Sequence, residues 1–107
     1  MISRYVIGNL SNMHIITQKR IWEAKKRFKS CESALDGWYR VISKNDYNDF
    51  AELKKVFGAI DKVGCYYVFD IGGNKLRLIT NIHSNRRKVF IRYILTHKEY
   101  DKGNWKN

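Results

Sequence analysis

The sequence has no proline, and its seven glycines are not concentrated in one segment, so no Pro- or Gly-rich linker divides its 107 residues. A chain of this length can form one hydrophobic core but not two. No apolar run approaches the roughly 20 residues that a membrane-spanning helix needs. Residues 1–12 carry one charge and lack the long apolar stretch and cleavage site of a signal peptide. We therefore expect a cytoplasmic protein with no membrane partner, formed by one domain over residues 13–107 and an N-terminal extension or alternative start over residues 1–12.

Cysteine is also scarce. Cys31 and Cys65 show no CxxC spacing, and no histidine is placed to complete a zinc site with them. Because thiols stay reduced in the cytosol, we expect both to be free and buried. A Gly-rich phosphate loop is absent too, since Gly72 and Gly73 connect two expected strands rather than opening a helix. These absences predict a protein without a metal or a cofactor.

Acidic residues are few in relation to basic ones. Ten Asp and Glu face 21 Lys and Arg, which gives a net charge of +11. Residues 71–107 hold nine of the basic residues and only two acidic ones, so this segment alone carries +7. A positive field of this size attracts polyanions and speeds their encounter with the protein. The charge therefore indicates a nucleic acid or an acidic protein as the partner.

The hydrophobic pattern changes period along the chain. Residues 18–29, a segment from about residue 30, and residues 50–57 repeat apolar residues at helical spacing, with Thr17, Ser30 or Ser33, and Asp49 as expected N-caps. Residues 14–16, 65–71, 75–82 and 88–95 have the composition of strands. On the last strand we expect one face to hold four apolar or aromatic residues: Val89, Ile91, Tyr93 and Leu95. The pattern predicts an α+β fold, with helices packed on one face of a small, mainly antiparallel β-sheet.

Cations are expected on the other face of this sheet. Lys75 and Arg77 are two positions apart on one strand, which places them roughly 6.6 Å apart on the same face. Arg92 projects from the next strand, on the face opposite Val89 and Ile91. This arrangement is that of a platform for a nucleic-acid backbone.

The segment after the last strand contains groups that can move protons. His97, Lys98 and Tyr100 lie within four positions of each other. Metal-free RNA cleavage needs a base for the 2′-hydroxyl, positive charge at the phosphate and an acid for the leaving oxygen. A histidine suits either proton-transfer role, because it titrates near neutral pH. By itself the cluster is weak evidence for catalysis, because such clusters occur at many helix ends.

Several segments together resemble the HigB-type toxins of the RelE/ParE superfamily. Residues 50–57 read FAELKKVF, residues 72–79 read GGNKLRLI, and residues 96–101 read THKEYD. The resemblance runs in order from about Met13 to Trp105. It implies a RelE-like, microbial-ribonuclease-like fold and a toxin that cleaves mRNA in the ribosomal A site and so inhibits translation. It also implies a HigA-type helix-turn-helix antitoxin, which links the toxin to operator DNA.

The resemblance also indicates a site. Its catalytic residues would be Lys75, Arg77, His97 and Tyr100, with Arg77 on the phosphate, Lys75 or His97 as base, and His97 or Tyr100 as acid. Other basic residues would bind RNA and the ribosome: Lys54, Arg86, Arg87, Lys88, Arg92, Lys98 and Lys102. Two alternatives remain open from the sequence, a ParE-like toxin that poisons DNA gyrase and a non-catalytic module that binds RNA or antitoxin.

Overall fold

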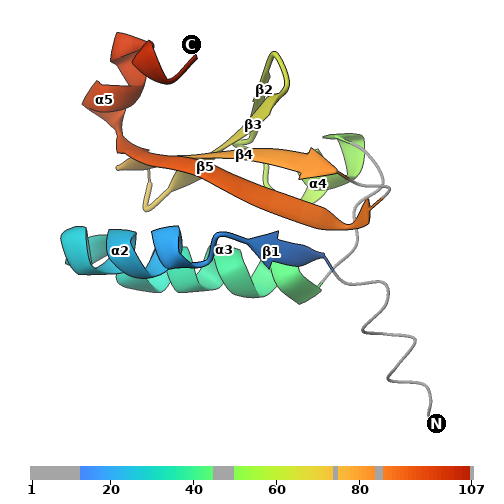
Figure 1. Cartoon of the computed structure of the whole chain (residues 1–107), viewed down its shortest axis with the longest axis horizontal. Helices are drawn as coiled ribbons and strands as arrows, with labels where there is room; N and C mark the ends of the chain where they lie inside the picture. The colour runs from blue at the N-terminus through green and yellow to red at the C-terminus, as the bar shows by residue number, and fades with distance from the viewer. Residues whose placement is uncertain (1–12, 45–49, 74, 84–85, 107) are drawn as a thin grey trace, which may run out of the picture.

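The computed structural model describes residues 13–44, 50–73, 75–83 and 86–106, which form a five-stranded sheet and its flanking helices (Figure 1). The strands are β1 (His14–Ile16), β2 (Asp61–Val63), β3 (Tyr66–Ile71), β4 (Leu76–His83) and β5 (Lys88–Thr96). The helices are α2 (Lys19–Arg27), α3 (Glu32–Lys44), α4 (Phe50–Val56) and α5 (His97–Lys102), with 3-10 turns at Lys29–Cys31 and Asn104–Lys106. The expected cap Asp49 lies outside the described residues.

The sheet has the strand order β1-β5-β4-β3-β2, with β1 parallel to β5 and the other pairs antiparallel. Helices α2 and α3 lie side by side against one face of it (Figure 1). Their apolar stripes, which include Leu35 and Ile42, pack against strand residues such as Leu78 and Val89 to form the main core. The α+β architecture is therefore confirmed, and the first strand, β1, joins the sheet beside β5.

Strand β5 contains a β-bulge, which the regular alternation of apolar and polar residues in its sequence did not predict. Ile79 pairs with Tyr93 while Thr80 pairs with Ile91, so Arg92 is the extra residue on β5. An inserted residue shifts the inside–outside alternation of the strand beyond it. Val89 and Ile91 are buried in the main core, but Tyr93 is exposed and Leu95 packs on the opposite face. The expectation of one common face is thus wrong beyond Ile91.

The face opposite α2 and α3 is partly covered, which corrects the expectation of an open platform. Val68, Ile79 and Trp105 form a second, smaller apolar cluster there. The segment after β5 folds back as α5, on the side of the sheet to which the β2–β3 hairpin also rises (Figure 1). The sequence did not predict α5 as a helix or β2 as a strand.

Two local expectations are also corrected. Thr17 is not an N-cap, because the cap residue of α2 is Gln18 and the Thr17 hydroxyl bonds instead to the backbone of Ile91. Both cysteines are free, as expected, and Cys31 is buried. Cys65, however, is exposed, because it lies in the turn between β2 and β3.

Candidate functional site

Arg77 lies near the start of β4, where α5 folds back against the sheet. Its cross-strand partner on β3 is Asp70, and Nη1 of Arg77 lies 2.5 Å from Oδ1 of Asp70. The guanidinium carbon is 5.4 Å from the ring centre of Tyr100 on α5. Only 14% of the Arg77 side chain is exposed. A carboxylate and an aromatic ring therefore hold this guanidinium in one place, which a phosphate-binding group requires.

Tyr100 is fixed by the C-terminal turn. Its ring stacks on Trp105 with centroids 5.0 Å apart, and the Trp105 indole N–H donates to the Tyr100 carbonyl at 3.0 Å. Burial raises the pKa of the Tyr100 phenol, and the negative charge of Asp61 raises it further, against an opposing effect of Arg77. The phenol is therefore protonated at neutral pH, and it can donate a hydrogen bond or a proton but cannot act as a base.

His97 is the first residue of α5, and about half of its side chain is exposed. Its Nδ1 lies 3.0 Å from Oδ2 of Asp101, one helical turn further along. A carboxylate at Nδ1 orients the imidazole and favours the tautomer whose Nε2 is the lone-pair nitrogen. This arrangement resembles the base-and-orienting-carboxylate pairs of hydrolytic enzymes, and it suits His97 to proton transfer.

The register of β4 and β5 places the four expected catalytic residues at one end of the sheet. Leu76 pairs with Thr96 at one end of these two antiparallel strands. Lys75, which precedes Leu76, and His97, which follows Thr96, therefore lie at the same end. Arg77 and Tyr100 meet beside them. We call Lys75, Arg77, His97 and Tyr100 the α5-end site. Lys98 and Lys102 are exposed on α5 itself and add positive charge around this site.

The remaining expected binding residues do not join the α5-end site. Arg86, Arg87 and Lys88 lie at the other end of β5, about 26 Å away at the usual rise of a strand. Arg92 is exposed in the bulge, and its Nε donates to Oδ1 of Asn81 at 2.6 Å. Lys54 is exposed on α4, and its Nζ donates to the Ile60 carbonyl at 3.3 Å. Along β5 the expected basic residues thus form two groups with Arg92 between them, and Lys54 on α4 belongs to neither group.

Three residues that contact the α5-end site were missed by reasoning from the sequence: Asp70, Asp101 and Trp105. The i,i+4 spacing of His97 and Asp101 was visible and would have indicated their pairing. Asp70 could not be found from the expected turn at residues 72–74, because that turn would set Phe69 opposite Arg77, whereas Ile71 pairs with Leu76 and so places Asp70 there. No sequence signal indicated Trp105, because its role depends on how the chain folds back over the sheet.

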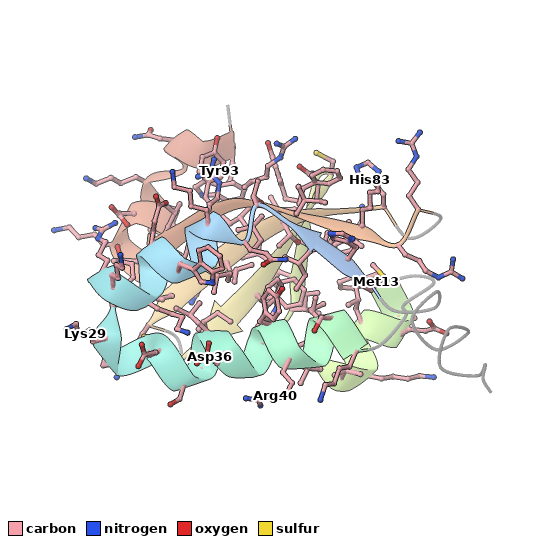
Figure 2. All side chains as sticks on the ribbon, turned by 60° about the horizontal axis from the view of Figure 1, so that its bottom comes forward. Met13, Lys29, Asp36, Arg40, His83 and Tyr93 are labelled. Atoms are coloured by element: carbon pink, nitrogen blue, oxygen red, sulfur yellow. The ribbon has the colours of Figure 1, made fainter. Side chains whose placement is uncertain are left out.

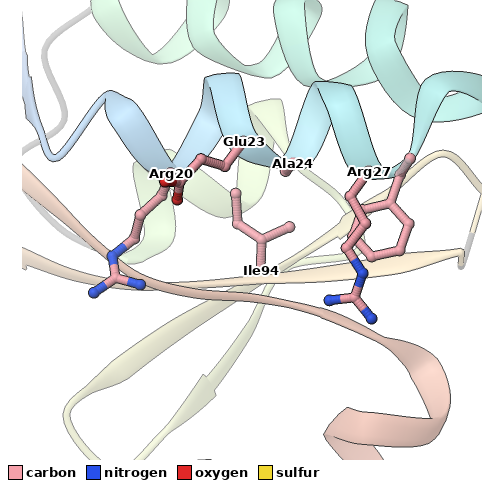
Figure 3. Close-up of a pocket in the computed structure, with 6 residues that line it drawn as sticks. Arg20, Glu23, Ala24, Arg27 and Ile94 are labelled. Carbon is pink, nitrogen blue, oxygen red and sulfur yellow. The ribbon is translucent and has the colours of Figure 1, made fainter.

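An ion pair also connects helix α5 to helix α2. Oε2 of Glu99 lies 3.4 Å from Nη2 of Arg27, which borders a hollow of about 240 Å³ between α2 and β5. Figure 3 shows Arg20 and Arg27 on either side of this hollow, with Ile94 of β5 between them. Contacts to α2 and to the C-terminal turn therefore hold α5 from two sides.

Neither a metal centre nor a membrane span is found in the described part of the chain. No three His, Cys, Asp or Glu residues lie close enough together there to hold a metal ion. None of the described helices is both long enough and apolar enough to cross a membrane.

Comparison with known proteins identifies the family. Residues 31–103 match the model of the family HigB_toxin, described as the RelE-like toxic component of a toxin–antitoxin system. The "mRNA interferase toxin HigB" of Escherichia coli K12 is 35% identical over 92 residues, which are 83% of this chain and 88% of the relative. The "mRNA interferase HigB" of Shigella flexneri shows the same values, and that of Escherichia coli O6:H1 is 34% identical over 93 residues, 84% of this chain and 90% of the relative. The chain belongs to the HigB_toxin family of RelE-like toxins.

Proposed function

We propose that this toxin is an mRNA interferase, an endoribonuclease that cleaves messenger RNA without a metal ion at the α5-end site. Two kinds of evidence support the proposal. Relatives that align with most of the chain are named mRNA interferases. The observation that carries it is the geometry of the site, where Arg77 contacts Tyr100 and His97 pairs with Asp101 at the same end of β4 and β5.

The reaction is an internal displacement at phosphorus. The 2′-oxygen forms a bond to the adjacent phosphorus while the bond from phosphorus to the 5′-oxygen breaks. Arg77 neutralises the charge that builds on the phosphate. His97 or Lys75 takes the proton of the 2′-hydroxyl, and His97 or Tyr100 supplies a proton to the leaving 5′-oxygen. The products are a 2′,3′-cyclic phosphate and a 5′-hydroxyl.

We infer the partners from the family and the charge. A toxin of a toxin–antitoxin system has an antitoxin, and here we expect a HigA-type helix-turn-helix protein through which the pair reaches operator DNA. The net charge of +11 favours binding to mRNA and rRNA in the A site of the small ribosomal subunit, in the cytoplasm. The ribosome would also hold the RNA in the in-line geometry that the displacement needs.

The double variant Arg77→Ala, His97→Ala tests the proposal in a cell-free translation reaction. Wild-type protein should stop synthesis and leave mRNA cut at codon boundaries. The variant should lose at least about 100-fold in cleavage rate, because it lacks both charge stabilisation and a proton-transfer group.

Arg40→Ala is the matched control for loss of a charge. Arg40 is exposed on α3 and points away from the molecule (Figure 2), so this variant should cleave as wild type does. His97→Gln alone checks the result with little risk to folding, since His97 is half exposed. A double variant that folds and cleaves at the wild-type rate contradicts the site. Intact mRNA together with inhibited gyrase would favour the ParE-like alternative.

A further inference from the structure

A pocket of about 380 Å³ lies beside the α5-end site, on the side of Trp105. It is lined by residues from β5, α5 and the C-terminal turn: Tyr93, Leu95, Glu99, Lys102, Asn104 and Trp105. Its volume is within the range of small-molecule sites, and its mix of apolar walls with a few polar groups is typical of them. None of the steps proposed for cleavage uses this pocket.

The bulge at Arg92 creates one wall of the pocket. Without the extra residue, the alternation of β5 would carry Tyr93 toward the main core together with Val89 and Ile91. With it, Tyr93 turns outward and is 36% exposed, which makes it one of the few exposed large hydrophobic residues in the described chain. The other walls include Leu95 and the buried edge of Trp105, which is 4% exposed. An exposed aromatic ring thus stands beside an apolar surface.

Polar groups lie at the border of the same pocket. Asn104 is exposed and offers an amide with both donor and acceptor atoms, and Lys102 adds a positive charge. The carboxylate of Glu99 accepts from the Thr96 backbone N–H at 2.9 Å, so its position is fixed. An aromatic wall, an amide and a cation are the groups that bind an unstacked nucleobase in single-stranded RNA.

The pocket is directly connected to the residues proposed to act on the phosphate. Leu95 is the cross-strand partner of Arg77, and Trp105 stacks on Tyr100, which in turn contacts Arg77. A phosphate at Arg77 therefore places the neighbouring base within reach of the pocket. From this connection we propose that the pocket binds a nucleobase of the RNA next to the scissile phosphate, with Tyr93 stacking on the base and Asn104 contacting its edge. The proposal rests on the proposed ribonuclease function and names the residues that would determine its sequence preference.

The charge around the pocket favours RNA over a protein side chain as its occupant. Lys102 and the carboxylate of Glu99 both border the pocket, and Nζ of Lys106 lies 5.7 Å from the ring centre of Trp105. Arg92 directly precedes Tyr93 on β5, so the basic residues near the pocket outnumber this one carboxylate. Cations around a small stacking pocket track a phosphate backbone, whereas the fully buried centre of a protein interface is depleted of charge.

Binding can be measured without cleavage. Short 2′-O-methyl oligonucleotides of A, C, G or U cannot be cut, because their 2′-oxygen is blocked. On adding them to the isotope-labelled full chain, we expect the NMR signals of the Trp105 indole N–H and the Asn104 amide to shift, more for one base than for the others. Tyr93→Ala should weaken binding about 10-fold, as loss of one stacking contact does, while Tyr93→Phe retains it.

Trp22→Ala removes an exposed aromatic residue of α2, outside the pocket, and should bind as wild type does. On translating ribosomes, Asn104→Ala should change the codons that are cut while cleavage continues. The pocket is refuted if no oligonucleotide shifts Trp105 or Asn104, or if only signals near Arg86–Lys88 respond, even when mRNA is cleaved. If the signals shift but the wild-type protein does not cleave mRNA, the nuclease proposal is wrong and the proposal that the pocket binds a nucleobase is retained.

Discussion

At the scale of single residues, Thr17 shows how one side chain can replace a strand partner. Strand β1 pairs with β5 only as far as Phe90, and β5 continues beyond it. The Thr17 hydroxyl accepts from the Ile91 N–H at 3.1 Å and donates to the Ile91 carbonyl at 3.0 Å. Thr17 does so with φ at +67°, a conformation that costs a β-branched residue some strain. The two bonds satisfy a buried backbone position directly before the bulge.

Replacing this hydroxyl with a methyl group should destabilise the fold. In Thr17→Val the shape and the backbone strain are kept, but both Ile91 groups lose their partner, which costs about 1–3 kcal/mol in the free energy of unfolding. Urea unfolding followed by tryptophan fluorescence measures the difference. Thr17→Ser keeps the hydroxyl and should retain most of the stability. Equal stability of the Val variant and wild type would show that water replaces the hydroxyl.

At the scale of elements, α5 is a six-residue helix whose stability depends on the capping interactions at its two ends. Its N-cap Thr96 and Glu99 form a capping box, and Gly103 ends the helix in the left-handed conformation with φ at +75°. The hydrogen bond from the Thr96 backbone N–H lowers the pKa of Glu99, and the positive charge of Arg27 lowers it further. An isolated helix of this length is unstable in water, so these contacts keep His97 and Tyr100 in place.

The lowered pKa of Glu99 predicts a pH-dependent contribution to stability. A carboxyl group with a lower pKa in the folded state stabilises the fold above its unfolded pKa, and this contribution is lost as pH falls through the folded pKa. Glu99→Gln should therefore be less stable than wild type at neutral pH, with a difference that shrinks in acid. Thermal unfolding across this pH range measures it. Glu23→Gln, an exposed carboxyl on α2, should show a smaller effect, and equal profiles of the two variants would contradict the assignment.

The elements also show what the sequence could and could not predict. The helical spacing of Leu35, Trp38 and Ile42 predicted α3 correctly, because a long apolar stripe determines a helix without reference to the rest of the fold. Strand β2 has only three residues and an exposed Asp and Lys, so it has almost no pattern of its own. The bulge at Arg92 exists only in relation to β4, and a single-strand pattern cannot reveal it. The same reason applies to the site: Arg77 was found as a residue type, but its contacts with Asp70 and Tyr100 required the fold.

At the scale of the whole molecule, positive charge lies at both ends of β5. One end carries the α5-end site with Lys98 and Lys102, and the other carries the β4–β5 turn with Arg86, Arg87 and Lys88. The two groups are about 26 Å apart, which is several nucleotides of extended RNA rather than one phosphate. We therefore expect the distant group to contribute to binding the ribosome or the flanking RNA, and not to the chemical step.

The double variant Arg86→Gln, Lys88→Gln separates binding from chemistry. Removing two phosphate contacts should raise the ribosome concentration needed for half-maximal cleavage, and the slope of log affinity against log salt should become shallower by about 1.4 to 1.8. The rate at saturating ribosomes should stay unchanged, because His97 and Arg77 are untouched. Lys19→Gln, Lys26→Gln on α2 removes the same charge from exposed positions away from the β4–β5 turn and should leave the slope nearly as it is. If instead the saturated rate fell with the affinity unaltered, the turn would act in catalysis, and the separation of the two basic groups along β5 would be wrong.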